Sequence, residues 1–222
     1  MPGLGPAFFV EPDCVVMIRF KNVSLKLGSK QLLENFSLNI ARGDKIVISA
    51  PSGSGKSTLL KLLLGFFEPD EGKILFNGEE VKPGNMRILR PQIAYLSQDV
   101  DFPNGKVEEV FSEIFHYSVN RGLNYSRELL IEKLSEVKLS EDILKKNTID
   151  ISGGERQRLG WILVMLLNRP VLLLDEPTSA LDDAMKRYFV DYIKTTNKTV
   201  ICSSHDAEWQ SEPMRVFHSL RS

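Results

Sequence analysis

Short apolar runs alternate with stretches of helical periodicity along this chain of 222 residues. The runs KIVISA (45–50), VLLLD (171–175) and TVICSS (199–204) are rich in branched aliphatic residues, as expected for strands covered on both faces. Helical spacing follows at 57–65 and at 183–194. Strands that alternate with helices predict an α/β fold with a mostly parallel sheet.

The N-terminal third carries a different strand pattern. Loosely alternating residues at 17–27 and 36–40 predict two further strands. A hairpin is expected at 73–81, because the pair Asn77-Gly78 suits a type I′ turn. We therefore expect an antiparallel β subdomain beside the parallel sheet.

After residue 98 the apolar residues follow a helical rather than a strand spacing. Apolar residues recur at helical spacing between 107 and 146, which predicts a helical insert at about 99–150. The first 16 residues hold three prolines and two glycines and lack the pattern of a signal peptide, so 1–16 is expected to be a flexible tail. The remaining chain, 17–222, is then one folded domain.

The composition excludes several classes of protein. With 42% hydrophobic residues, 26% charged residues and a net charge of −1, the chain is typical of soluble proteins and offers no basic surface for nucleic acid. Two cysteines cannot build a disulfide scaffold, which favours a reducing compartment. No apolar run approaches the ~20 residues of a membrane-spanning helix. We expect a cytoplasmic protein whose contact with a membrane needs a partner.

The stretch APSGSGKST at 50–58 lies between a predicted strand and a predicted helix, which is the setting of a phosphate-binding loop. The N–H groups and the dipole of a helix N-terminus attract phosphate, and glycines let the backbone approach it closely. Lys56 would reach the outer phosphates, Ser57 would ligate Mg²⁺, and Thr58 would lie against the α-phosphate. The expected nucleotide-binding residues here are Ala50, Pro51, Ser52, Gly53, Ser54, Gly55, Lys56, Ser57 and Thr58.

Ala50 stands where the common pattern G-x-x-x-x-G-K-[ST] has its first glycine. An alanine forced to positive φ would cost about 1–2 kcal/mol. We therefore expect position 50 to end the strand at negative φ, where a methyl group is tolerated.

A second group of motifs narrows the class of nucleotide hydrolase. ISGGERQR at 151–158 precedes VLLLDEPTSALD at 171–182, while Gln98 and His205 each follow a predicted strand. With the loop at 50–58, these motifs resemble the ATP-binding cassette (ABC) ATPases from about Met17 to His205. The resemblance implies a P-loop NTPase with an antiparallel β subdomain and an inserted helical subdomain, and hydrolysis of ATP with Mg²⁺.

Four side chains near the expected γ-phosphate site take roles from this comparison. Asp175 ends an apolar strand at the sheet edge where ligands bind, so its carboxylate can hold Mg²⁺ through water. The resemblance implies that Glu176 is the general base, that Gln98 reaches Mg²⁺ and the attacking water, and that His205 contacts the γ-phosphate. The expected catalytic residues are Glu176, His205 and Gln98, and the expected metal ligands are Ser57, Gln98 and Asp175.

Ser152 and Glu155 have the spacing of a capping box at the start of a helix, and the glycines between them leave its N–H groups uncovered. The resemblance implies that Ser152, Gly153, Gly154 and Glu155 contact ATP held by a second subunit. Two cassettes, identical or paired, would then enclose two ATP molecules head to tail. Glu155 replaces the more common glutamine and adds negative charge beside a triphosphate.

Two positions depart from, or add to, the family pattern. Leu27 occupies the place where the family usually stacks an aromatic ring on adenine, so we expect only modest discrimination between ATP and GTP. Phe102, beside Pro103, is expected to be exposed in a groove that accepts a short helix of a membrane subunit, whereas Val107 and Val110 are expected to close the core of the insert.

The best interpretation is an ATP-binding subunit that drives transport through a separate integral membrane permease, at the inner face of the cell membrane. No spanning segment and no second cassette are visible in the sequence, which favours a separate subunit. The alternative is a non-transport ABC ATPase acting in cofactor or macromolecular assembly.

Overall fold

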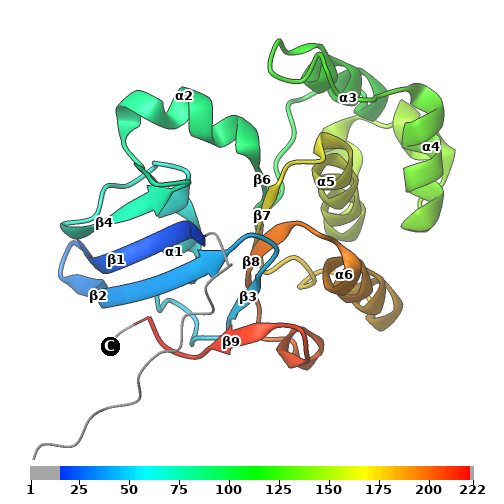
Figure 1. Ribbon diagram of the computed structural model, residues 1–222. Helices are drawn as coiled ribbons and strands as arrows, with labels where there is room; N and C mark the ends of the chain where they lie inside the picture. Colours follow the sequence, from blue (N-terminus) through cyan, green and yellow to red (C-terminus); the bar gives the residue numbers. More distant parts are fainter. Residues whose placement is uncertain (1–15, 221–222) are drawn as a thin grey trace, which may run out of the picture.

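A five-stranded parallel sheet forms the centre of the computed structural model, which describes residues 16–220 (Figure 1). Its strand order is β6-β7-β8-β3-β9, and every neighbouring pair is parallel. The strands are β3 (Lys45–Ile48), β6 (Ile93–Leu96), β7 (Val171–Asp175), β8 (Thr199–Ser203) and β9 (Arg215–Phe217). The parallel sheet predicted from the apolar runs is confirmed.

A four-stranded antiparallel sheet lies beside it, on the left in Figure 1. Its order is β2-β1-β4-β5, from β1 (Val16–Leu27), β2 (Lys30–Ala41), β4 (Glu71–Phe76) and β5 (Glu79–Glu80). Asn77 and Gly78 join the last two strands with φ of 50° and 85°, the positive values that a type I′ turn requires. The expected hairpin is confirmed.

The helices are distributed along the chain as the periodicity indicated. They are α1 (Lys56–Leu63), α2 (Met86–Leu89), α3 (Val107–His116), α4 (Arg127–Glu136), α5 (Gly153–Leu167) and α6 (Asp183–Thr195). Short 3₁₀ helices lie at Pro83–Asn85, Arg90–Gln92, Glu141–Lys145, Thr148–Asp150 and Ala207–Gln210. The segment 99–150 contains α3 and α4, and its extent as an inserted subdomain stays a prediction. Across residues 16–220, no helix has both the length and the apolar character needed to cross a membrane.

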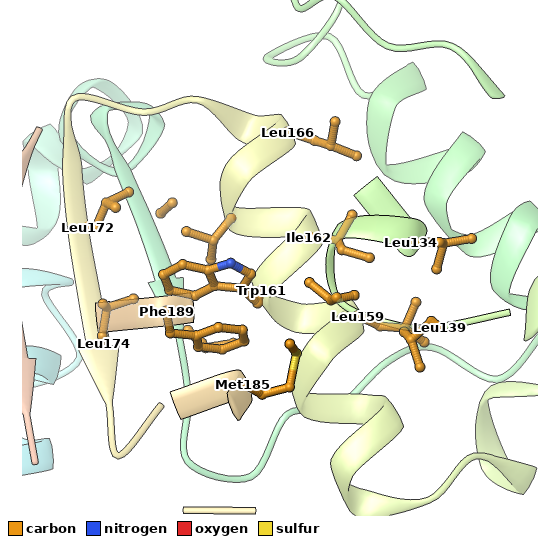
Figure 2. Close-up of a cluster of buried hydrophobic side chains, with 14 of the residues drawn as sticks. Leu134, Leu139, Leu159, Trp161, Ile162, Leu166, Leu172, Leu174, Met185 and Phe189 are labelled. Carbon is orange, nitrogen blue, oxygen red and sulfur yellow. The ribbon is translucent and has the colours of Figure 1, made fainter. Parts of the chain in front are cut away.

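Strand β7 separates two hydrophobic cores, which explains its unbroken apolar sequence. Leu172 and Leu174 pack into the core under α3 to α6, whereas Val171 and Leu173 pack into the core that contains α1 and the antiparallel sheet. Figure 2 shows the first core, where the ring of Trp161 on α5 lies against Phe189 on α6 with a centroid separation of 3.9 Å.

One expectation is overturned at this level. Phe102 is only 8% exposed and belongs to the core with Phe111, from which its ring centroid is 6.1 Å away, so the prediction that it is exposed is wrong. Val107 and Val110 are buried in the same core, as expected. The predicted flexible tail lies almost wholly outside the described residues, since β1 begins at Val16.

Candidate active site

A cavity of about 520 Å³ opens at the carboxyl ends of β3, β6, β7 and β8, where an open α/β sheet binds its ligands. The site-forming residues therefore come from loops far apart in the sequence that the sheet places together. The lining residues are Leu32, Ser52, Gly53, Gly55, Lys56, Ser57, Thr58, Gln98, Glu176, Ser179 and His205.

The glycine loop has the geometry of an anion cradle. Gly53 and Gly55 have φ of 72° and 106°, which side chains disfavour, and a Cβ on Gly55 would lie 3.1 Å from Cβ of Leu32. Gly55 is also the N-cap of α1, and no side chain caps its N–H groups. These groups and the Lys56 ammonium fit the phosphates of a nucleotide.

Three residues of the predicted loop face the other way. Ala50, Pro51 and Ser54 line a separate cavity of about 220 Å³ behind the loop. Ala50 is 1% exposed and is not among the described residues with positive φ. The expectation of an unstrained alanine at this position is confirmed, and its methyl group contributes to the core.

Lys56, Glu176 and His205 converge at the mouth of the loop. The Lys56 ammonium donates to the Ala50 carbonyl oxygen at 2.8 Å and lies 2.7 Å from Nε2 of His205. Oε1 of Glu176 lies 3.6 Å from Lys56 Nζ and 3.5 Å from His205 Nε2. A carboxylate, an imidazole and an ammonium this close together can bind a phosphate and transfer a proton.

Asp175 lies beneath this cluster and is 3% exposed. Its two carboxylate oxygens accept hydrogen bonds from different strands: Oδ1 from the Ser203 hydroxyl at 2.6 Å, and Oδ2 from the Tyr95 hydroxyl at 3.3 Å. Burial and the charge of Asp175 together raise the pKa of Tyr95, so this hydroxyl stays a donor.

The oxygen donors of the site suit a hard divalent cation. Ser57 and Gln98 supply a hydroxyl and an amide oxygen to the cavity. The buried Asp175 is not itself a lining residue, but it directly precedes the lining residue Glu176. Residues 16–220 contain no cluster of three or more His, Cys, Asp or Glu side chains that could hold a metal. This donor set fits Mg²⁺, which binds through one or two carboxylates together with substrate phosphates and water.

Glu176 adopts a backbone conformation that its side chain disfavours. Its φ is 45°, whereas most other non-glycine residues with positive φ in the described chain are asparagines. Such a conformation costs about 1–3 kcal/mol and persists only where neighbouring contacts enforce it. The Glu176 N–H donates to the Ser203 carbonyl oxygen at 3.0 Å and to the Ser203 hydroxyl at 3.1 Å, which supplies that enforcement.

The segment Ser152–Glu155 begins α5 away from this cavity. The predicted capping box is confirmed: Glu155 N–H donates to the Ser152 hydroxyl at 3.2 Å, and Ser152 N–H donates to Glu155 Oε2 at 2.7 Å. The Ser152 N–H and the Lys146 ammonium, 2.9 Å from Glu155, lower the pKa of Glu155 to about 2. Lys146 thereby balances the negative charge that Glu155 adds. Gly153 lines a further cavity of about 730 Å³, which is also lined by Gln98.

Besides Tyr95, three residues at the site were not anticipated from the sequence. Lys30, on the first residue of β2, places its ammonium 3.3 Å from where a Cβ on Gly53 would lie, so a second cation flanks the loop. Leu32 lines the cavity from the same strand. Ser203 contacts both Asp175 and Glu176. No sequence motif marks them, because the hairpin and β8 reach the site only through the fold.

A glycine loop, paired carboxylates and a histidine at the carboxyl edge of a parallel sheet define a P-loop nucleotide hydrolase. The chain belongs to the ABC transporter family, whose sequence model matches residues 33–179. Binding and hydrolysis of ATP are the activities that this family implies.

Relatives and solved structures agree with that membership. The chain is 32% identical to the probable iron export ATP-binding protein FetA of Escherichia coli (strain K12), over 86% of each chain. It is 31% identical to the choline transport ATP-binding protein OpuBA of Bacillus subtilis (strain 168), over 86% of this chain and 52% of that protein. The dimeric structure of MJ0796, a bacterial ABC transporter cassette, superposes with a TM-score of 0.78 at 28% identity, covering 92% of this chain and 96% of that chain. The sequence-based assignment to the ATP-binding cassettes of ABC transporters is confirmed.

Proposed function

We propose that this chain hydrolyses ATP in a Mg²⁺-dependent reaction and thereby drives transport by a separate membrane subunit. The observation that carries the proposal is the convergence of Lys56, Glu176 and His205 at the mouth of the phosphate loop. All three groups line the same cavity as the glycine loop, which supports a role at the γ-phosphate of a bound nucleotide.

The protein groups divide the chemistry between them. Lys56 and the N–H groups of α1 hold the outer phosphates and stabilise the charge that develops on them. Glu176 accepts the proton of the attacking water, and His205 and Gln98 orient that water and the γ-phosphate. Ser57, Gln98 and Asp175 would hold Mg²⁺, which would supply positive charge to the outer phosphates when bound.

We further propose that two cassettes form a head-to-tail dimer around two ATP molecules. Ser152, Gly153, Gly154 and Glu155 lie apart from the phosphate loop of their own chain, which supports a role toward the loop of a second chain. A dimer of the related cassette MJ0796 has been solved with ADP and Pi bound, with a TM-score of 0.74 to this chain at 26% identity.

The membrane subunit and the location follow from the same proposal. FetA and OpuBA are named as export and transport ATP-binding proteins, which supports a permease as the partner here. The cassette would then sit at the cytoplasmic face of the membrane through that permease. Co-expression with the multi-span membrane protein encoded nearest to it should yield a detergent-stable complex. Failure to co-purify with any such protein would favour a role in assembly.

The catalytic part is tested by Glu176→Gln, which removes the proton acceptor but keeps the side-chain shape. We expect ATP binding to persist, turnover to fall by about 10²-fold or more, and a dimer to accumulate with Mg-ATP in size-exclusion chromatography. The exposed substitution Glu109→Gln on α3 is the matched control and should leave all three measurements unchanged. Near-normal hydrolysis by Glu176→Gln would remove Glu176 from the role of base.

A further inference from the structure

Ser203 is a fully buried residue at the end of β8, one position beyond the free thiol Cys202 and two before His205. It stands opposite Asp175 in the parallel pairing of β7 and β8. Its side chain therefore faces the point where the chain leaves β7 and turns into the site. No motif in the sequence singles this serine out.

The Ser203 hydroxyl makes two hydrogen bonds, and both go to consecutive residues of the site. It donates to Asp175 Oδ1 at 2.6 Å and accepts from the Glu176 N–H at 3.1 Å. A hydroxyl with one proton can donate only once, so its donor is committed to the carboxylate. The geometry makes Ser203 a single bridge between the proposed cation ligand and the proposed base.

Each half of that bridge has a distinct consequence. The donated bond fixes the rotation of the Asp175 carboxylate, whose other oxygen accepts from Tyr95, so the carboxylate cannot turn without breaking a buried bond. The accepted bond, together with the bond from the same N–H to the Ser203 carbonyl oxygen, holds Glu176 at its positive φ of 45°. Without it, the Glu176 backbone can relax toward the ordinary region and carry the carboxylate away from Lys56 and His205.

We propose that Ser203 is a positioning residue that couples the orientation of the cation ligand Asp175 to the backbone conformation of the base Glu176. This inference rests on the proposed function, because it assigns Ser203 a purpose only in a Mg²⁺-dependent hydrolase. A role of this kind differs from ordinary burial of a satisfied hydroxyl, because it must affect the chemical step and the response to Mg²⁺ more than the stability of the fold.

Ser203→Ala is the direct test, since it removes one oxygen atom from a buried strand and leaves the backbone bonds of β8 intact. Losses of about 10- to 100-fold are typical when a partner of a metal ligand is removed. We expect kcat for ATP to fall within that range, and KM for Mg-ATP to rise several-fold because Asp175 is the proposed cation ligand. ATP binding without Mg²⁺ should stay within about twofold of wild type, because the phosphate loop is untouched.

The second readout is equilibrium binding of a fluorescent ATP analogue, with and without Mg²⁺. Affinity without Mg²⁺ should match wild type, and the gain in affinity on adding Mg²⁺ should be reduced at least several-fold. Ser203→Cys keeps a weak donor and a similar volume, so it should recover part of both losses.

Thr199→Val is the matched control. Thr199 lies on the same strand and is 1% exposed, and its hydroxyl accepts from the Gly43 N–H at 2.9 Å, away from the site. Its loss should lower thermal stability to a similar extent as Ser203→Ala but leave kcat and the Mg²⁺ response unchanged. If Ser203→Ala behaves like Thr199→Val, with lower stability alone, the inference is overturned. A wild-type protein that fails to hydrolyse Mg-ATP would instead contradict the proposed function itself.

Discussion

The side chain at position 27 determines what an adenine ring could touch if the nucleotide lies as the family resemblance implies. Leu27 ends β1, is 40% exposed, and pairs across the hairpin with Lys30, the lysine beside the glycine loop. A leucine offers apolar contact without ring stacking, while Lys30 adds charge on the phosphate side. Nucleotide recognition in this protein should therefore depend more on the phosphates than on the base.

Leu27→Tyr should raise the affinity for ATP. Stacking between aromatic rings contributes about 0.5–1.5 kcal/mol, which corresponds to roughly a 2- to 12-fold gain. GTP should gain similarly, and the wild type should discriminate only modestly between the two in fluorescence binding and hydrolysis assays. Ile88→Tyr, which adds the same ring at an exposed position on α2, should have no effect. A hundredfold preference of the wild type for ATP would reveal an adenine contact other than Leu27.

At the scale of elements, the segment between β6 and α3 shows how a loop residue can belong to a core. Phe102 is preceded by Asp101 and followed by Pro103, Asn104 and Gly105, yet its ring packs against Phe111 of α3 and is 8% exposed. The Thr148 hydroxyl donates a hydrogen bond to the Pro103 carbonyl oxygen at 2.8 Å. This bond ties the loop that contains Phe102 to the segment just before α5. The segment after Gln98 is thus coupled to the helices by packing.

Phe102→Ala should lower the free energy of unfolding by about 3 kcal/mol, because it leaves a cavity between the loop and α3. Phe66→Ala is the control: its ring is 60% exposed, and the change should cost less than about 1 kcal/mol. Urea unfolding followed by tryptophan fluorescence measures both. Equal stability of the two variants would show that the Phe102 ring does not contribute to the core.

At the scale of the whole molecule, the N-termini of α1 and α5 both carry glycines but open into different cavities. Gly55 opens α1 into the nucleotide cavity, whereas Gly153 opens α5 outside it. Gly153 has no positive φ, and a Cβ built on it meets nothing within 4 Å. A side chain at this position should therefore leave the fold of the single chain unchanged, and its main effect should be on contact with a second chain.

Gly153→Asp, combined with Glu176→Gln, should abolish the ATP-dependent dimer in size-exclusion chromatography while the monomer still binds ATP. The added carboxylate would face the triphosphate held by the partner and repel it. Gly122→Asp, at another glycine with open space around it, should leave the dimer intact. A dimer that survives Gly153→Asp would show that α5 does not contact the partner's nucleotide.

Local patterns in the sequence determined most of the fold. The apolar runs of β3, β7 and β8 predict buried parallel strands because period and composition act within a few residues. The turn at Asn77-Gly78 and the capping box at Ser152 were predictable for the same reason, since each is satisfied by its own short segment. The glycine loop and the carboxylates could be recognised because their chemistry requires fixed residue types at fixed spacing.

Tertiary structure alone decided which residues support that chemistry. Tyr95, Ser203 and Lys30 reach the site from three different strands. Each side chain lies at the site only because strands that are distant in sequence are neighbours in the fold. Burial of Phe102 likewise depends on α3 and Thr148, which the flanking polar residues do not reveal. Hydrogen bonds and close packing act over a few ångströms in space, so a one-dimensional pattern predicts them only where contact partners are also neighbours in sequence.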